Sequence, residues 1–187
     1  MKPVRISLGR EPITVLLCAL VAIAIARPVA AEETIPAAVQ PFVGTWVHTG
    51  GSAEEQARRD AIEAAIADLP AMIRPMVRKK LTAGTAIVNS LTIEAAGSKL
   101  TIGETGGESL TTPVDGSTVE VKRKGKTARV RREVVDGNLR NHAVMPDSWA
   151  TIVFRLSEDG RTMTVLRQVG SDRLPKAVLF EATYTRQ

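Results

Sequence analysis

The second half of the chain alternates apolar and polar residues with a period of two. From Asn89 onward, Leu91 and Ile93 alternate with Thr92 and Glu94, as in half-buried β-strands. Turn sequences interrupt this period and favour hairpins. The pattern predicts about ten antiparallel strands. The turns are expected at Gly97-Ser98, Asp115-Gly116, Lys124-Gly125, Asp136-Gly137-Asn138, Pro146-Asp147 and Glu158-Asp159-Gly160.

A long meander of hairpins leaves exposed edge strands unless the sheet closes on itself. We therefore predict an all-β domain with a helical insertion, built as an antiparallel up-and-down β-barrel. A two-sheet sandwich is the main structural alternative. The sequence shows no repeat of fixed period, which argues against a solenoid or a propeller.

A helical period interrupts the strands over residues 53–83. Ser52 and Glu55 match a capping box, which predicts a helix that starts at Ala53. Pro70 is expected to separate two helices, and Gly84 to end the second. This helix-turn-helix insertion would pack one apolar face on the barrel. The apolar stripe consists of Ile62, Ile66, Leu69, Ile73, Met76 and Leu81.

The first residues have the form of an export signal. Lys2, Arg5 and Arg10 precede an apolar run over residues 13–26, and small residues follow at Val29-Ala30-Ala31. This pattern predicts a signal peptide that is cleaved after Ala31, and a periplasmic or secreted protein. An uncleaved membrane anchor is the alternative.

Removal of residues 1–31 would change the net charge and the cysteine content of the mature chain. That segment holds four cations and one acid, so the formal net charge falls from +5 to about +2, and the basic pI is poor evidence for nucleic-acid binding. The single cysteine, Cys18, is also removed, which excludes disulfides and thiolate chemistry from the mature chain. We expect an extended lead-in over residues 32–41 and one barrel domain over 42–187.

Phe42-Val43-Gly44-Thr45-Trp46 opens the first predicted strand. A glycine within a strand marks close backbone approach, and a Trp ring can close one end of a barrel. The segment resembles the opening strand of the calycins, the superfamily of lipocalins and fatty-acid-binding proteins. The paired helices and the ten strands resemble the fatty-acid-binding branch. The resemblance implies a ligand carrier with a helical lid, in which Gly44 and Trp46 help to close the barrel.

The resemblance also implies ligand contacts. In the fatty-acid-binding branch an Arg-x-Tyr near the C-terminus clamps the ligand carboxylate. The matching place here is Ala182-Thr183-Tyr184, which retains Tyr184 and lacks the arginine. A second carboxylate-binding arginine of that branch would fall near Arg155. The missing arginine argues against assigning a fatty acid as the ligand.

A basic stretch over residues 122–132 suggests an anion site. Alternation sends Arg129 and Arg131 to one face and Arg132 to the other, and a cation that faces the interior needs an anionic partner. The hypothesis is an anion-coordinating wall formed by Arg132 or by the Arg129 and Arg131 pair. A solvated basic hairpin is the alternative. Two further residues expected among those that fill the barrel or line its cavity are Phe154 and Phe180.

Four cations lie on the second predicted helix beside its apolar stripe: Arg74, Arg78, Lys79 and Lys80. The resemblance implies that such lid residues contact anionic membranes, where each cation gains roughly 1 kcal/mol. The alternative is ordinary packing of the stripe with the cations in solvent.

The sequence offers little for catalysis. His48 and His142 are its only histidines, too few for a metal site. Nothing fixes the geometry of a triad of His142, Asp147 and Ser148, and no phosphate-binding or nucleophile motif is present. A hydrolase would need activity that depends on His142. We predict a protein that is not an enzyme and has no cofactor or metal.

These observations favour an exported carrier of a small apolar or amphipathic, possibly anionic, ligand. The alternative is an envelope interaction module with a filled barrel, which docks its basic hairpin or helix on an anionic surface or a protein partner. No nucleic-acid partner is expected.

Overall fold

The computed structural model describes residues 35–123 and 125–187. The predicted signal peptide, residues 1–31, lies outside these described residues, so export stays a prediction. Within the described residues no helix is long and apolar enough to cross a lipid bilayer.

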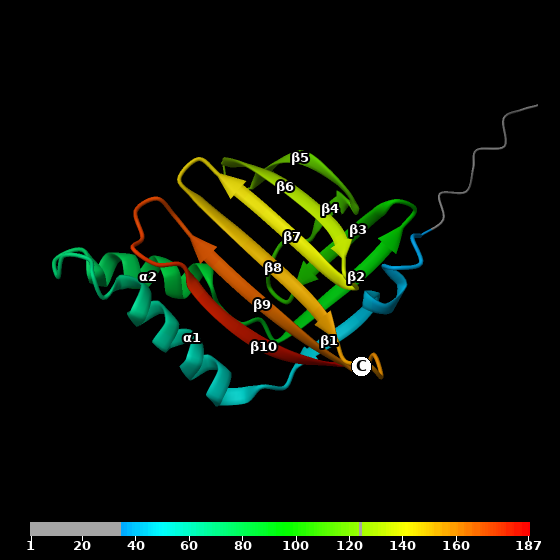
Figure 1. The fold of residues 1–187 in the computed structure, drawn as a ribbon, viewed down its shortest axis with the longest axis horizontal. Coiled ribbons are helices and arrows are strands. Elements are labelled where there is room, and N and C mark those ends of the chain that lie inside the picture. Colours follow the sequence, from blue (N-terminus) through cyan, green and yellow to red (C-terminus); the bar gives the residue numbers. More distant parts are fainter. Residues whose placement is uncertain (1–34, 124) are drawn as a thin grey trace, which may run out of the picture. The chain divides into compact units, whose positions relative to one another are not determined.

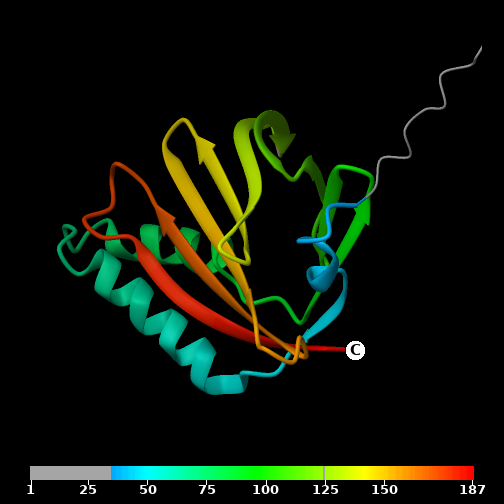
Figure 2. The same cartoon turned by 45° about the vertical axis from the view of Figure 1, so that its right-hand side comes forward.

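Ten antiparallel strands form a nearly closed barrel (Figures 1 and 2). The sheet order is β4-β3-β2-β1-β10-β9-β8-β7-β6-β5, so strands adjacent in sequence pair from β5 to β10 and from β1 to β4, and β1 pairs with β10. The edge strands are β4 and β5. The predicted fold class is confirmed. The strands are β1 (Gly44–His48), β2 (Ser90–Ala96), β3 (Lys99–Glu104), β4 (Leu110–Pro113), β5 (Asp115–Arg123), β6 (Lys126–Val135), β7 (Asn138–Met145), β8 (Ser148–Leu156), β9 (Thr162–Gly170) and β10 (Val178–Arg186).

Alternate residues of each strand build the core, as the period of two predicts. Leu139, Phe154, Val165 and Ala182 lie side by side on the inner face of four neighbouring strands, and all are buried. Burial of one large apolar side chain contributes about 1.5–3 kcal/mol, so this cluster holds the barrel together. Its buried members are Val39, Phe42, Trp46, Leu91, Ile93, Leu100, Ile102, Val114, Leu139, Phe154, Met163, Val165, Ala182 and Tyr184.

One end of the barrel is closed by Trp46 and by a single turn of 3-10 helix, η1 (Gln40–Phe42). Trp46 is fully buried, and its Nε1 donates a 2.9 Å hydrogen bond to the Phe42 carbonyl. The Arg186 guanidinium lies 4.3 Å from the centroid of the Trp46 ring, a cation–π contact. Its Nη1 donates to the Val43 carbonyl over 2.7 Å. The Trp46 indole nitrogen and the Arg186 guanidinium are therefore both partnered.

Gly44 is needed where the chain enters β1. Its φ is +140°, and a Cβ there would lie 3.1 Å from Nη1 of Arg186. Both the backbone conformation and the close approach of Arg186 favour glycine.

The lead-in differs from the prediction. Residues 35–42 form turns rather than an extended segment, and the Val39 amide donates to the Pro36 carbonyl over 2.9 Å. The first strand begins at Gly44, not at Phe42. The reason is burial: Val39 and Phe42 are almost fully buried in the core cluster, which an extended lead-in would not allow.

The turn predicted at Asp115-Gly116 is also wrong. β5 runs through both residues, and its register against β6 shifts between Asp115 and Thr118. Gly116 has φ +82°, which suits the irregular backbone of a β-bulge. The Asp-Gly pair marks a bulge here instead of a hairpin.

Two helices lie between β1 and β2: α1 (Gly51–Ile66) and α2 (Arg74–Gly84). The break around Pro70 and the end of the second helix at Gly84 are as predicted. The predicted capping box is wrong, because α1 begins at Gly51 and its N-terminus has no side-chain cap. Glu55, expected in that box, forms an ion pair with Arg58.

The helix pair is fixed to one strand of the barrel. α1 lies alongside β10 (Figures 1 and 2). Glu54 of α1 accepts hydrogen bonds from the Thr183 amide (2.9 Å) and hydroxyl (2.6 Å). Burial opposes ionisation of Glu54, but hydrogen bonds from Thr183 and His48 outweigh it and lower its pKa. A second buried apolar cluster completes the contact: Ile62, Ala65, Ile66, Leu81, Val178 and Phe180.

Candidate ligand-binding site

A row of inward-facing residues crosses five strands of the barrel and carries three polar side chains. The register pairs Phe180 with Arg167, Arg167 with Ile152, Ile152 with Asn141, and Asn141 with Arg132. Two cations and an amide therefore share one layer of an otherwise apolar interior.

Arg132 of β6 is buried with most of its guanidinium unpartnered. Its exposed fraction is 1%. Nη1 donates to the carbonyl of Leu100 on β3, whereas Nε and Nη2 have no hydrogen-bond partner among the described residues. Burial lowers the pKa of Arg132 to about 10, so the group remains a cation at neutral pH. A buried charge without a counterion is costly, and the site thus holds a positive charge with two unused donors.

Arg167 of β9 is also buried, but both of its terminal nitrogens have partners in the protein. Its Nη2 donates to Glu104 Oε1 over 2.8 Å, and its Nη1 donates to the Ala86 carbonyl over 3.3 Å. This arginine links β9 to β3 and to the segment between α2 and β2. Its charge is balanced within the protein, unlike that of Arg132.

A cavity of about 70 Å³ lies beside Arg132. Leu91 and Phe154 form part of its apolar wall, and its polar wall includes Asn141 and Arg167 together with the carboxylates of Glu104 and Glu108. Asn141 Oδ1 is, like Nε and Nη2 of Arg132, a buried atom without a hydrogen-bond partner in the described chain. The space is enough for a small polar group such as a carboxylate.

The barrel interior is incompletely filled near this layer. Ile152 and Asn141 face inward, as do Ala150 and Ala143 in the next paired layer, yet all four remain half-buried rather than buried. Solvent therefore reaches part of the interior between the polar layer and the adjacent strand ends.

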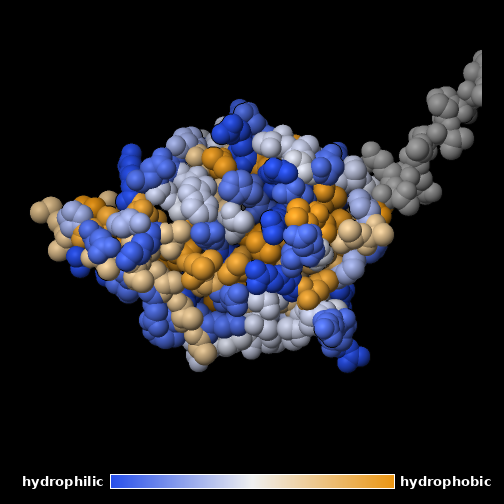
Figure 3. All heavy atoms as spheres, viewed as in Figure 1, coloured by the Kyte–Doolittle hydropathy of each residue, from blue (hydrophilic) through white to orange (hydrophobic). Residues whose placement is uncertain are grey.

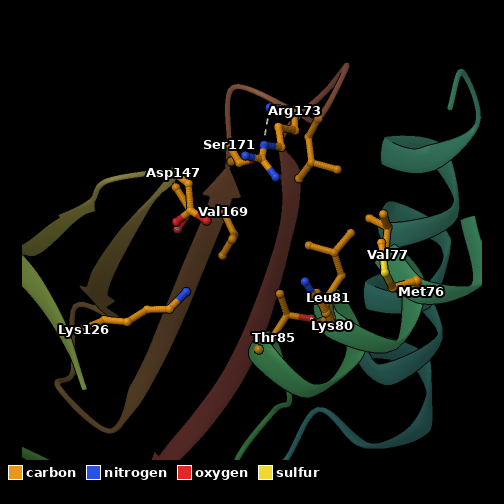
Figure 4. Close-up of a pocket in the computed structure, with 14 residues that line it drawn as sticks. Met76, Val77, Lys80, Leu81, Thr85, Lys126, Asp147, Val169, Ser171 and Arg173 are labelled. Carbon is orange, nitrogen blue, oxygen red and sulfur yellow. Dashed lines mark hydrogen bonds between the residues drawn. The ribbon is translucent and has the colours of Figure 1, made fainter. Parts of the chain in front are cut away.

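A larger pocket, of about 370 Å³, lies between α2 and the ends of the strands. We call it the mouth pocket. Figure 4 shows α2 on one side of it, with Leu81 and Lys80, and the barrel strands on the other, with Val169 and Lys126. The residues that line the pocket are Met76, Val77, Lys80, Leu81, Gly84, Thr85, Lys126, Asp147, Ser148, Val169, Gly170, Ser171, Arg173 and Leu174.

Arg155 does not face the interior, contrary to expectation. Phe154 and Leu156 on either side of it pack on the core, so alternation turns Arg155 outward. Its side chain is exposed, and its Nη1 lies 4.0 Å from Oε1 of Glu181 on the outer surface. Arg129 and Arg131 are exposed as well, so of these three arginines Arg132 is the one that faces the interior.

The predicted aromatic contacts are divided between two places. Phe154 lines the cavity beside Arg132, whereas Phe180 packs under the helix pair. Tyr184 is fully buried, and its hydroxyl donates to the Val88 carbonyl over 3.2 Å. Burial raises the pKa of Tyr184 to about 12. Its hydroxyl is thus engaged by the protein itself.

The four cations predicted on the helical lid differ in their contacts. Arg78 forms an ion pair with Glu63, with Nη2 and Oε2 2.7 Å apart, and Arg74 Nε donates to the Leu69 carbonyl over 2.8 Å. Lys79 and Lys80 are exposed.

The apolar stripe expected to pack on the barrel is exposed at its middle. Met76 is 56% exposed, Ile73 is 37% exposed, and the nearby Met72 is 92% exposed. The helical end of the molecule, at the left of Figure 3, shows hydrophobic and hydrophilic surface side by side.

The two histidines lie apart, each beside one polar partner. His48 Nε2 lies 2.9 Å from Glu54 Oε2 at the start of α1. His142 points to the outer face, where its Nδ1 lies 2.9 Å from the Thr151 hydroxyl. The described residues contain no group of three potential metal-binding His, Cys, Asp or Glu side chains.

Sequence reasoning missed several residues of the two pockets. Arg167 could have been found, because Met163, Val165 and Arg167 alternate along one strand face. Glu104 and Arg173 carried no comparable signal: one faces inward at a strand end, and the other lies in the β9–β10 loop.

Comparisons with known proteins give the fold. No protein-family model matches the sequence, and a search of curated proteins finds no match. Among solved structures, a secretory abundant heat soluble protein from Ramazzottius varieornatus is 10% identical, with a TM-score of 0.51 over 79% of this chain and 96% of that one. The fluorescent protein UnaG is 19% identical, with a TM-score of 0.50 over 80% of this chain and 99% of that one.

The domain has a calycin-like fold of the fatty-acid-binding-protein type. A fatty-acid-binding protein of Schistosoma mansoni, solved with arachidonic acid, is 18% identical over 80% of this chain and 98% of that one, with a TM-score of 0.48. At these identities the likeness concerns the fold of this calycin-like barrel and not its ligand.

Proposed function

We propose that the protein is an exported, non-enzymatic carrier that binds a small amphipathic molecule inside the barrel. The observation that carries the proposal is the buried guanidinium of Arg132, whose Nε and Nη2 lack partners in the described chain. A carboxylate or a similar anionic group on a ligand would supply the missing acceptors and the missing counter-charge.

The position of this cation compensates for a difference from the fatty-acid-binding branch. Ala182 stands where that branch has a clamping arginine, and the Tyr184 hydroxyl bonds to the Val88 carbonyl. Arg132 offers a cation from β6 instead of β10. The anionic group of a ligand would then sit beside Asn141 and Phe154, which line the same cavity.

The rest of the ligand needs apolar space. The half-buried inward residues Ala143 and Ala150 lie between the Arg132 layer and the strand ends, where their small apolar side chains would contact the apolar part of the ligand. An incompletely filled barrel favours a carrier over a module with a solid core.

A binding experiment on delipidated protein tests the role of Arg132. Decanoate should bind saturably to the wild type, and Arg132→Gln should lower its affinity by about tenfold or more, because a hydrogen bond to a charged group contributes about 1.5–3 kcal/mol. Arg129→Gln on the outer face of β6 is the matched control and should change little. Absence of saturable binding to decanoate and to a panel of other lipids and fluorescent probes would refute the carrier function; equal losses in the two variants would refute the role of Arg132.

The export part of the proposal is supported by the sequence of residues 1–31. N-terminal sequencing of the protein recovered from its native cells should begin at Glu32. A chain that still begins at Met1 would show that residues 1–31 are an uncleaved anchor or no export signal at all.

Contact with an anionic membrane is a second candidate function, favoured by the exposed Met72 and Met76 beside Lys79. The double variant M72E/M76E should weaken co-sedimentation with vesicles that contain phosphatidylglycerol. Leu179→Glu, at an exposed apolar residue of β10, is the control. Binding that is the same in both variants would exclude the helix pair as the contact surface.

A further inference from the structure

We propose that the mouth pocket is a second binding site, for an amphiphile whose head group is a doubly charged anion such as a phosphate monoester. The mouth pocket and the cavity beside Arg132 share no lining residue. The inference therefore goes beyond carriage inside the barrel and concerns a separate place on the same domain.

Three cations from three separate elements meet at this pocket. Lys80 belongs to α2, Lys126 begins β6, and Arg173 lies in the β9–β10 loop. Figure 4 shows their side chains around one opening, from different sides. In the part of the chain that the structure describes, none of the three has an ion pair with a carboxylate, although other exposed cations such as Arg78 do.

The charge at the rim matches a dianion. Asp147 is the one acidic residue that lines the pocket, against Lys80, Lys126 and Arg173, so the formal charge of the lining is +2. A phosphate monoester carries about −1.5 to −2 at neutral pH. The planar fork of Arg173 suits bidentate binding of phosphate oxygens, and lysines bind phosphate as point charges.

The apolar walls of the pocket favour a ligand that is larger than a free anion and partly apolar. Val77 and Leu81 of α2 face the pocket from one side, and Val169 and Leu174 from the barrel side. An inorganic ion would leave these apolar side chains unused, whereas an alkyl chain attached to the phosphate would cover them and remove apolar surface from water. The combination of a cationic rim and apolar walls points to a lipid-like phosphate.

The test compares three probes on the delipidated full-length mature protein by titration calorimetry. Decyl phosphate should bind at least about tenfold more tightly than decanol, which has the same chain and no charge, and inorganic phosphate should not bind saturably. The double variant K126E/R173E should lose about tenfold in affinity for decyl phosphate, since two attractions become repulsions of similar size, and should keep its affinity for decanol.

Two control variants make the outcome specific. K122E/R129E makes the same change of charge at exposed residues outside the pocket and should leave the affinity for decyl phosphate within about twofold of the wild type. Arg132→Gln should also leave it unchanged, because the two cavities are separate. A loss in K126E/R173E that exceeds both controls supports the site.

Several results would overturn the inference. Equal binding of decyl phosphate and decanol would mean that the rim does not select charge, and the carrier proposal would still stand. If inorganic phosphate alone binds tightly, the ligand of the mouth pocket is a free ion and not an amphiphile. Equal losses in K126E/R173E and K122E/R129E would indicate general electrostatic attraction. The two proposals can also fail separately. If decyl phosphate binds at the mouth pocket but Arg132→Gln does not change the affinity for decanoate, this inference stands and the proposed role of Arg132 is refuted.

Discussion

At the end of the barrel closed by η1, Trp46 donates to the Phe42 carbonyl and lies under the guanidinium of Arg186. At the end under α2, the corresponding space is the mouth pocket, and below it Arg132 has two donor nitrogens without partners in the described chain. Both ends use an arginine, but only the first arginine has its hydrogen bonds satisfied by the protein.

This difference separates stability from binding. Folded proteins satisfy their buried polar groups wherever nothing else requires them to remain open, and exceptions are concentrated at functional sites. The closed end follows the rule, with a large aromatic ring packed in a complete cluster. The interior beside Arg132 departs from it, which is why we place the carried ligand there. The comparison can be tested in three ways.

Trp46→Ala should have the largest effect. Removal of a fully buried Trp from a core typically costs about 3–5 kcal/mol, and the Arg186 contact is lost as well. We expect a large fall in the free energy of unfolding measured in urea. Trp149→Ala, at a half-buried residue of β8, is the control and should cost clearly less. Similar costs for the two variants would mean that the closed end is not the centre of stability.

Tyr184 should make the protein sensitive to alkali. Burial raises its pKa to about 12 in the folded state, whereas an unfolded tyrosine titrates near 10. Its stabilising contribution is therefore complete below about pH 10 and is lost as the pH rises from about 10 to about 12, by roughly 2–3 kcal/mol. Urea unfolding between pH 9 and pH 12 should show a steeper fall for the wild type than for Tyr184→Phe. Parallel curves would contradict the raised pKa.

Arg132→Met should have a small effect on stability with an unusual sign. Replacing an unpaired buried charge by an apolar group of similar size is often neutral or stabilising by about 1–2 kcal/mol, so the free energy of unfolding should stay constant or rise while decanoate binding falls. Arg167→Met is the matched control: it leaves Glu104 without its partner and should destabilise by about 2 kcal/mol. A destabilised Arg132→Met would show that Arg132 has a structural role instead.

Much of the fold could be predicted from local patterns. The period of two gave the strands, Pro70 separated the helices, and alternation along β6 set Arg132 apart from Arg129 and Arg131. These inferences depend on neighbouring residues in one segment, where side-chain direction follows directly from position.

The errors have a common physical cause. Arg155 was placed inside by comparison with a family instead of by the inward direction of Phe154 and Leu156 on either side of it. The exposed Ile73 and Met76 belong to the predicted apolar stripe, which continues beyond the barrel surface available to cover it. In both cases the outcome depended on which element packs against which, and tertiary contacts override local pattern.

The sequence by itself determined the antiparallel meander, the helix pair and an inward cation on β6, because the periods of strands and helices are local properties. Only the tertiary structure decided what that cation meets. Barrel closure brings Leu100 to one nitrogen of Arg132 and nothing in the described chain to the other two, while it brings Glu104 to Arg167. It also gathers Lys80, Lys126 and Arg173 around one pocket, although they lie far apart in the sequence, because α2 packs over the strand ends.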